Sequence, residues 1–181
     1  MHNFWRFAGY GSANKSKNSN LSCKYIPMPN TYTQLYIHCV FAVKYRAAML
    51  QESWDDRLRL YITAIVQNDG HKMLAINNVA DHLHFFVGLS PQQSVSDMLR
   101  RVKGDSSEWI ATEKLTQHKF QWQEGYAAFS HSKTQVDAVV KYIANQQEHH
   151  RKVTFLEEYK KMLTDFGVQF DERYIFASPI E

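Results

Sequence analysis

Hydrophobic residues first recur at every second position in the segment that follows residue 31: Leu35, Ile37, Cys39, Phe41 and Val43. A period of two is typical of a strand with one apolar face. The spacing then changes to that of a helix, through Trp54, Leu58, Tyr61, Ile62 and Ile65. Gly70 stands where such a helix would end.

The middle of the chain predicts two more strands, over residues 72–76 and 79–89, with Asn77-Asn78 as the turn between them. Ser94 and Asp97 are typical of a helix start. The apolar positions that continue this second helix are Val95, Met98, Leu99 and Val102.

A fourth strand is predicted over residues 125–130, followed by one long helix from 134 to about 152 and a short helix over 155–163. The order is strand, helix, strand, strand, helix, strand, and then the additional helices. This order predicts an α+β protein with a ferredoxin-like sheet: four antiparallel strands, helices on one face, and the helix after residue 134 in addition.

We expect three regions along the chain. Residues 1–30 read as a flexible leader, because residues 12–20 (SANKSKNSN) are polar and without a period, and Pro27 and Pro29 follow. Residues 31–152 form the main domain, and residues 153–181 form a C-terminal helical tail.

Composition narrows the function only slightly. The chain has 181 residues, of which 44% are hydrophobic, enough for a core of its own. Lys and Arg number 21 against 18 Asp and Glu, and a net charge of +3 is too small to indicate nucleic-acid binding by itself. Cys23 and Cys39 fit neither a disulfide scaffold nor a zinc site. Neither a signal peptide nor an apolar run of roughly 18 residues is present, so we expect a cytoplasmic protein without membrane contact.

Two histidines in the predicted third strand carry the first candidate chemistry. Because side chains alternate along a strand, His82 and His84 face the same way, whereas Leu83, Phe85 and Val87 face the core. Neutral ring nitrogens at this spacing can hold one divalent ion if further ligands join them. The alternative is that the two imidazoles only form a polar sheet face.

The helix after residue 134 supplies a second group of candidates. Tyr142 and Gln146 are four residues apart and share a helix face, with His149 three residues further on. A tyrosine hydroxyl is a weak nucleophile, and a metal ion that polarises the attacked phosphate offsets part of that weakness. The carbonyl oxygen of Gln146 is a hard ligand that suits magnesium or manganese. The adjacent apolar stripe, which would dock the helix, comprises Val136, Val139, Val140 and Ile143.

Together, these residues form a more specific pattern. A His-apolar-His strand followed, 58 residues after His84, by Tyr-x-x-x-Gln on a helix resembles the HUH single-tyrosine transposases, the IS200-like family of small bacterial insertion sequences. Further strings of that family match in the same order: Lys103-Gly104, Ser106-Ser107, WQEGY at 122–126, Phe129-Ser130 and YIANQQEHH at 142–150.

The resemblance implies a role for each matching residue. His82 and His84 would be metal ligands, Gln146 the third ligand, and Tyr142 the nucleophile. Family members use Mg²⁺ or Mn²⁺, cut single-stranded DNA beside a folded hairpin, and leave a 5′-phosphotyrosine and a free 3′-hydroxyl. They are bacterial homodimers in which the tyrosine helix can serve the other subunit's metal site.

Several side chains around these positions have two interpretations. The basic residues could contact phosphates along a DNA hairpin or be solvated surface charges: Arg100, Arg101, Lys103, Lys141 and Arg151. Four aromatic residues could stack on unpaired bases, although we expect at least half of them to pack in the core: Phe120, Trp122, Tyr126 and Phe129. His38 and His149 are candidates for positions just outside the metal ligands. Strand alternation turns Asp81 away from His82, so we do not expect it to be a ligand.

Other functions remain open on the sequence. A chromosomal relative that processes repeated palindromes would share all of the residues above. A non-catalytic single-strand binder would use the same sheet with exposed aromatics. A hydrolase that activates water would make Tyr142 dispensable, and an inactive transposase remnant would keep the fold alone.

Overall fold

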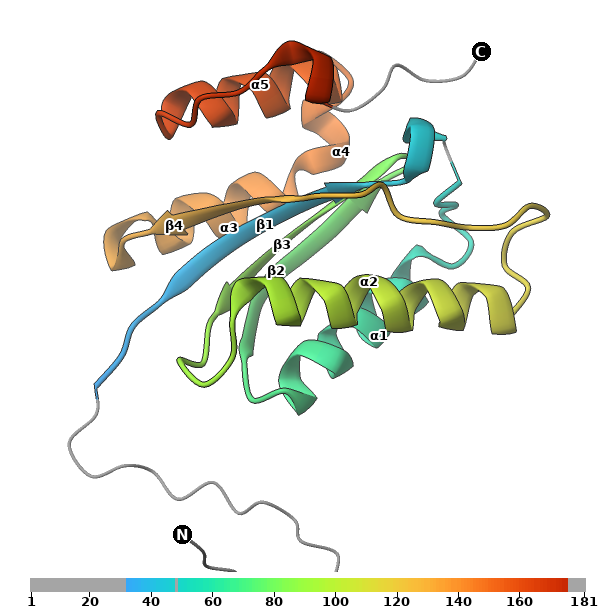
Figure 1. Ribbon diagram of the computed structural model, residues 1–181, viewed down its shortest axis with the longest axis horizontal. Helices are drawn as coiled ribbons and strands as arrows, with labels where there is room; N and C mark the ends of the chain where they lie inside the picture. The colour runs from blue at the N-terminus through green and yellow to red at the C-terminus, as the bar shows by residue number, and fades with distance from the viewer. Residues whose placement is uncertain (1–31, 48, 176–181) are drawn as a thin grey trace, which may run out of the picture. The chain divides into compact units, whose positions relative to one another are not determined.

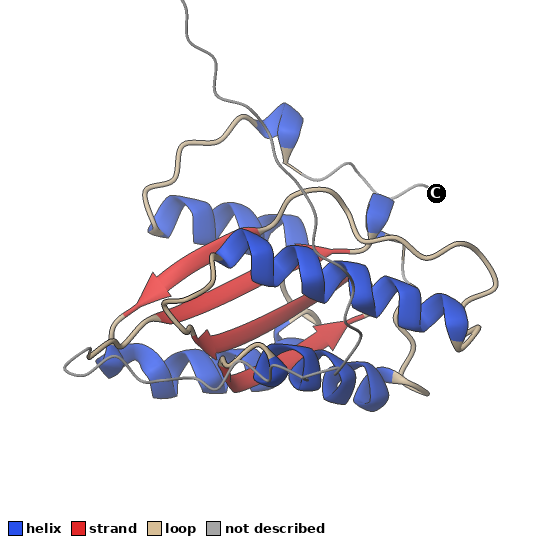
Figure 2. Cartoon of the chain, turned by 60° about the horizontal axis from the view of Figure 1, so that its bottom comes forward, coloured by secondary structure: helices blue, strands red, loops and turns tan. Residues whose placement is uncertain are grey.

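The computed structural model describes residues 32–47 and 49–175, so the expected leader, residues 1–30, lies outside the described part. Residues from Thr33 onward belong to one compact unit. Four antiparallel strands form one sheet, drawn in red in Figure 2. Along the sheet their order is β2-β3-β1-β4. Their bounds are β1 (Tyr36–Ala42), β2 (Lys72–Val79), β3 (His82–Gly88) and β4 (Ala127–His131). This is the predicted ferredoxin-like arrangement.

Helices cover both faces of this sheet (Figure 1). The first face carries α1 (Asp55–Asn68) and α2 (Val95–Thr112), as predicted. The second face carries the tyrosine-bearing helix α3 (Val136–Ala144) together with α4 (Gln146–His149) and α5 (Phe155–Asp165). Three short 3-10 turns complete the described elements: η1 (Lys44–Arg46), η2 (Lys133–Gln135) and η3 (Glu172–Tyr174).

Strand β3 divides its side chains between the two faces as the alternation predicts. Leu83, Phe85 and Val87 are fully buried in the main core beneath α1 and α2. His82 and His84 are also fully buried, but on the opposite face. The imidazole pair is therefore not an open polar surface.

Two smaller apolar clusters enclose the imidazole face. One joins β1 and β4 to α5 through Val40, Phe129, Phe155, Tyr159 and Leu163, among others. The other packs Phe86 of β3 against the apolar stripe of α3, namely Val136, Val139 and Ile143. The second face thus has an apolar rim on both sides of the histidines, which excludes water from them.

The structure corrects the predicted turn at Asn77-Asn78. Strand β2 continues through both residues to Val79, and the turn lies at Ala80-Asp81. Both asparagine side chains have distant partners: Asn77 donates to carbonyls of α3, and Asn78 donates to the Asp55 carboxylate at 2.8 Å. These partners outweigh the preference of asparagine for turns.

The long helix predicted over 134–152 is also interrupted. Asn145 has non-helical backbone angles (φ −95°, ψ 15°) and separates α3 from α4. The side-chain amide of Asn77 occupies the carbonyl oxygens of Ile143 and Ala144, which a continuous helix would use for its own hydrogen bonds. None of the helices in the described ranges is long and apolar enough to cross a membrane.

Candidate active site

Each of the two imidazoles of β3 has a hydrogen-bond partner at its Nδ1 atom. His82 Nδ1 lies 2.7 Å from the Asp81 carboxylate, and His84 Nδ1 lies 3.1 Å from Nε2 of His38 on β1. The His82 ring also stacks on Phe155, with ring centres 4.0 Å apart. Both Nε2 atoms are consequently left to face the space beneath α4 and α5.

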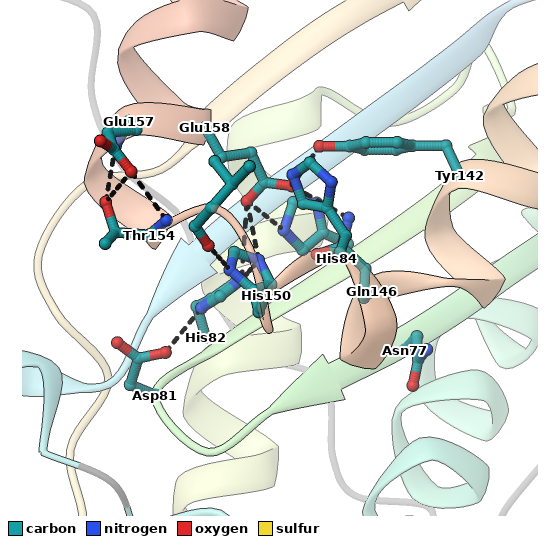
Figure 3. Close-up of polar contacts among 12 residues, drawn as sticks. Asn77, Asp81, His82, His84, Tyr142, Gln146, His150, Thr154, Glu157 and Glu158 are labelled. Carbon is teal, nitrogen blue, oxygen red and sulfur yellow. Dashed lines mark hydrogen bonds and ion pairs between the residues drawn. The ribbon is translucent and has the colours of Figure 1, made fainter.

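One carboxylate on α5 occupies the centre of this space (Figure 3). A capping box between Thr154 and Glu157 starts α5 and places Glu158 in the first turn, where its side chain is only 3% exposed. Its Oε2 lies 3.1 Å from Nε2 of His150, 3.4 Å from Nε2 of His84 and 3.7 Å from Nε2 of His82. Strand β3, the end of α4 and helix α5 therefore meet at one side chain.

The other oxygen of Glu158 binds the helix that carries the tyrosine. Oε1 accepts hydrogen bonds from the Tyr142 hydroxyl and, at 3.0 Å, from Nε2 of Gln146 (Figure 3). Tyr142 on α3 and Gln146 at the start of α4 reach the same carboxylate, although the break at Asn145 places them on two helices rather than on one helix face. The predicted nucleophile and the imidazole pair are thereby joined through a single carboxylate.

The cluster has the donor atoms of a metal site. One ligand atom from each of four residues lies within 4.8 Å of the others, namely His82, His84, His150 and Glu158. Within the described part of the chain, four buried atoms in or beside this cluster have no hydrogen-bond partner: Nε2 of His84, Oε2 of Glu158, Oε1 of Gln146 and Nε2 of His149. Such atoms are unfavourable unless something binds them. The residues present therefore fit a bound cation.

Burial and mutual contacts set the ionisation of the cluster. Burial lowers the pKa of His82 to about 4 and also lowers that of His84, so both are neutral, as metal ligation requires. Burial alone would raise the pKa of Glu158, but the neighbouring imidazoles of His150 and His84 outweigh it and lower that pKa well below its usual range. Burial and the nearby Glu158 charge raise the pKa of Tyr142. The Tyr142 hydroxyl therefore stays protonated and donates a hydrogen bond to the Glu158 carboxylate.

The outer candidates are placed differently from one another. His38 is buried and contacts His84, and burial holds its pKa well below the usual value. His149 lies beside Tyr142, with ring centres 5.6 Å apart, and its Nε2 is 3.6 Å from Glu158. Asp81 does not point away from His82, because it lies in the turn before β3 and strand alternation does not apply to it.

The basic candidates separate into two groups. Arg100 and Arg101 are exposed on α2, on the other side of the sheet, where they pair with acidic residues of the first face. Lys103 donates to the carbonyl oxygens of Gln123 and Gly125. Lys141 is exposed and lines a hollow together with Tyr142 and His149. Arg151 is exposed and pairs with Glu148 at 2.9 Å.

Three of the four aromatic candidates are core residues, as we expected for at least half of them. Phe120, Trp122 and Phe129 are at most 7% exposed, and the indole nitrogen of Trp122 donates to Ser106 at 2.9 Å. Tyr126 is 39% exposed. Only Tyr126 among the four presents a ring that is free to stack on a base.

Sequence reasoning missed Glu158 and gave His150 too little weight. His150 follows α4 directly, and its Nε2 lies 3.0 Å from that of His82. The helix break at Asn145 changes which of the following residues face the sheet. A prediction that assumes one continuous helix therefore gives the wrong orientation for His150. The Thr154–Glu157 capping box is a usable sequence signal, since it fixes where α5 starts and which glutamate of the pair turns inward.

Comparison with known proteins identifies the family of the chain. Residues 31–146 match the family model described as "Transposase IS200 like". The ISDra2 transposase TnpA of Deinococcus radiodurans is 26% identical over 120 residues, which cover 64% of this chain and 86% of the relative.

Two solved structures share the fold. A transposase crystal structure from Deinococcus radiodurans R1 is 25% identical, with a TM-score of 0.53 over 65% of this chain and 94% of that one. A REP-associated tyrosine transposase bound to a REP hairpin is 14% identical, with a TM-score of 0.52 over 85% of this chain and 96% of that one. The family match extends from the start of the domain to Gln146 and so includes the histidine pair and the tyrosine. The chain therefore belongs to the IS200-like transposases, a family of DNA-processing enzymes.

Proposed function

We propose that this transposase cuts and rejoins single-stranded DNA through a covalent bond between Tyr142 and a 5′ phosphate. One observation carries the proposal: the Tyr142 hydroxyl and the His82–His84 pair converge on the same buried carboxylate, Glu158. His82, His84 and Gln146 would hold a divalent ion, Mg²⁺ or Mn²⁺. When bound, that ion would polarise the phosphate and stabilise the charge that develops on its oxygens.

The chain's own residues account for the bond changes. Tyr142 Oη attacks the phosphorus, so that a P–Oη bond forms and the bond from phosphorus to the 3′ oxygen breaks. The 3′ oxygen leaves with that bond's electron pair and takes up a proton. The hydroxyl proton of Tyr142 is already directed at Glu158 Oε1, which is the nearest acceptor when Oη attacks. A free 3′-hydroxyl can later attack the phosphotyrosine and rejoin a strand, because the ester conserves the bond energy.

The DNA would approach Tyr142 through the hollow on α3 and α4. Lys141 and Lys152 line that hollow with Tyr142, and their charges suit the phosphates of an unpaired strand. We propose a hairpin beside the cleaved strand as the recognition element and a homodimer as the active form, working in the bacterial cytoplasm. The alternative is a related enzyme that processes repeated palindromes with the same residues. The REP-associated relative is bound to a REP hairpin in its structure, which makes this alternative worth testing.

The experiment is to incubate the full chain with single-stranded DNA from candidate element ends, labelled at the 3′ end, and separately with palindromic hairpins labelled in the same way, in Mg²⁺ or Mn²⁺. We expect label to remain with the protein on a denaturing gel and to be lost in Tyr142→Phe. Tyr126→Phe is the matched control, since that ring is exposed on another part of the surface. Cleavage without protein-bound label would instead indicate a hydrolase that uses water, and binding without cleavage would indicate a single-strand binder.

A further inference from the structure

We propose that His150 and Glu158 are two additional metal ligands, so that three imidazoles and one carboxylate form a transition-metal site. The inference rests on the proposed function only in placing a metal beside Tyr142. Neither residue belongs to the His82, His84 and Gln146 set that the family resemblance implies. His150 follows α4, and Glu158 lies on α5, beyond the matched residues 31–146.

All three imidazoles are anchored in the way that metal-binding histidines usually are. Such histidines bind the ion with one ring nitrogen and hydrogen-bond the other to a carboxylate, carbonyl or similar group. Nδ1 of His82 contacts Asp81 at 2.7 Å, Nδ1 of His84 contacts His38 at 3.1 Å, and Nδ1 of His150 contacts the Val153 carbonyl at 2.9 Å. Each ring thus presents Nε2 to the same point.

Four of the six distances between these ligand atoms are close to those expected around a shared ion, and all six are within 4.8 Å. Ligand atoms about 2.1 Å from one ion lie about 3.0 Å apart at right angles and about 3.4 Å apart at tetrahedral angles. Nε2 of His150 lies 3.0 Å from Nε2 of His82 and 3.1 Å from Oε2 of Glu158. Oε2 lies 3.4 Å from Nε2 of His84 and 3.7 Å from Nε2 of His82. Small side-chain shifts therefore suffice for all four atoms to reach one ion.

The donor set selects a class of metal. Imidazole nitrogens suit zinc and other transition metals, whereas Mg²⁺ prefers oxygen ligands and retains several waters. Three imidazoles in a cluster that is almost closed to solvent favour Mn²⁺, Co²⁺ or Zn²⁺ over Mg²⁺. The carboxylate adds one negative charge and leaves a bound dication with a net positive charge toward a phosphate.

Glu158 would also connect the ion to the nucleophile. While Oε2 faces the imidazoles, Oε1 accepts the Tyr142 hydroxyl and the Gln146 amide. Glu158 is thus a ligand on one oxygen and a positioning group for Tyr142 on the other. Its loss would weaken metal binding and release the tyrosine ring, whereas the loss of His150 would affect the metal alone.

The test is to strip the full chain of metal with a chelator and titrate it with Co²⁺, followed by visible absorption and by calorimetry. We expect one ion per chain and an affinity for Mg²⁺ at least about 100-fold weaker than for Co²⁺. His150→Ala and Glu158→Gln should each weaken Co²⁺ binding by about 100-fold, the upper end of what loss of a supporting residue costs. His118→Ala and Glu148→Gln, both exposed, are the matched controls and should bind as the unaltered chain does.

X-ray absorption of the bound ion gives a readout that needs no variant. Three imidazoles in its ligand shell support the proposal, and two overturn it. Unchanged Co²⁺ affinity in folded His150→Ala and Glu158→Gln proteins would overturn it as well. Tyr142→Phe should bind Co²⁺ normally but form no DNA adduct. If the unaltered chain binds Co²⁺ through three imidazoles yet forms no adduct, the proposed function fails and the metal site stands.

Discussion

The side-chain amide of Asn77, on β2, donates a hydrogen bond of 2.9 Å to the main-chain carbonyl of Ile143, at the end of α3. The same amide donates to the carbonyl of Ala144 at 3.1 Å. These bonds fix the end of the tyrosine helix against a sheet strand 66 residues earlier in the chain. They also interrupt the helix one residue before Gln146, so that the chain can turn and place His150 over His82.

Replacing Asn77 with alanine should therefore loosen the end of α3. The carbonyls of Ile143 and Ala144 lose their donor, and at about 1 kcal/mol for each bond the free energy of unfolding should fall by about 2 kcal/mol. Thermal unfolding followed by circular dichroism measures this loss. Asn68→Ala, exposed at the end of α1, is the control, and equal melting temperatures for the two variants would show that the Asn77 bonds contribute nothing.

Asp81→Asn tests the support behind His82. Asparagine keeps the shape of the side chain but removes the negative charge that holds Nδ1, so metal affinity should fall by about 10–100-fold while the fold is retained. Calorimetric titration with Co²⁺ or Mn²⁺ measures the change. Asp165→Asn, at the end of α5, is the control, because this carboxylate is exposed and pairs with Lys161. An unaltered affinity in Asp81→Asn would remove this carboxylate from the site.

Metal binding should stabilise the folded chain. Because the ligand atoms come from strands and helices that meet only in the folded state, an ion at 100 times its dissociation constant adds about 2.7 kcal/mol to the free energy of unfolding. For a chain of this size we expect a rise of about 5–10 °C in melting temperature, reversed by a chelator. His82→Ala should not show the rise. A rise of equal size in that variant would locate the stabilising ion elsewhere.

Ser106 and Ser107 offer a matched pair in the main core. The buried hydroxyl of Ser106 accepts the indole N–H of Trp122 at 2.9 Å and donates to the Val102 carbonyl. Ser106→Ala leaves that N–H buried without a partner and should cost about 1–3 kcal/mol. Ser107→Ala, at a partly exposed position, should cost far less. Denaturant unfolding of both variants measures the difference, and similar midpoints would contradict the assignment.

Salt dependence can separate the two groups of basic residues. Each phosphate contact with a single strand contributes about −0.7 to the slope of log affinity against log salt concentration. With an unpaired oligonucleotide as probe, Lys141→Ala should flatten the slope by about that amount, because Lys141 lines the hollow beside Tyr142. Arg100→Ala should leave it unchanged, since α2 covers the opposite face. A flatter slope in Arg100→Ala would instead place the unpaired strand on α2.

Local patterns in the sequence were sufficient for most of the fold. The alternation in β1 and β3 predicts which residues enter the core, and the Ser94 cap predicts the start of α2, where its side chain does accept from Asp97. The patterns failed where distant partners decide the backbone. Asn77 and Asn78 have the residue type of a turn but lie in a strand, because each has a partner elsewhere in the fold.

The same limit applies to the candidate site. His82, His84, Tyr142 and Gln146 could be selected because strand and helix periods place them in pairs. Glu158 could not be selected from the sequence, because nothing in the residue spacing of α5 shows that this helix folds back over the imidazoles. Its place depends on the break at Asn145 and on the packing of Phe155 and Tyr159 against β1 and β4.

The position of Glu158 on α5 also has a consequence for the time at which the site is completed. A ribosome makes the chain from its N-terminus, and the sheet with α1 to α3 is synthesised before α5. A nascent chain that ends between residues 142 and 158 carries the two strand histidines and Tyr142 but not the carboxylate that joins them. The complete cluster therefore exists only after α5 has left the ribosome and docked. By then, the sheet and the helices α1 to α3 that surround the cluster have already been synthesised.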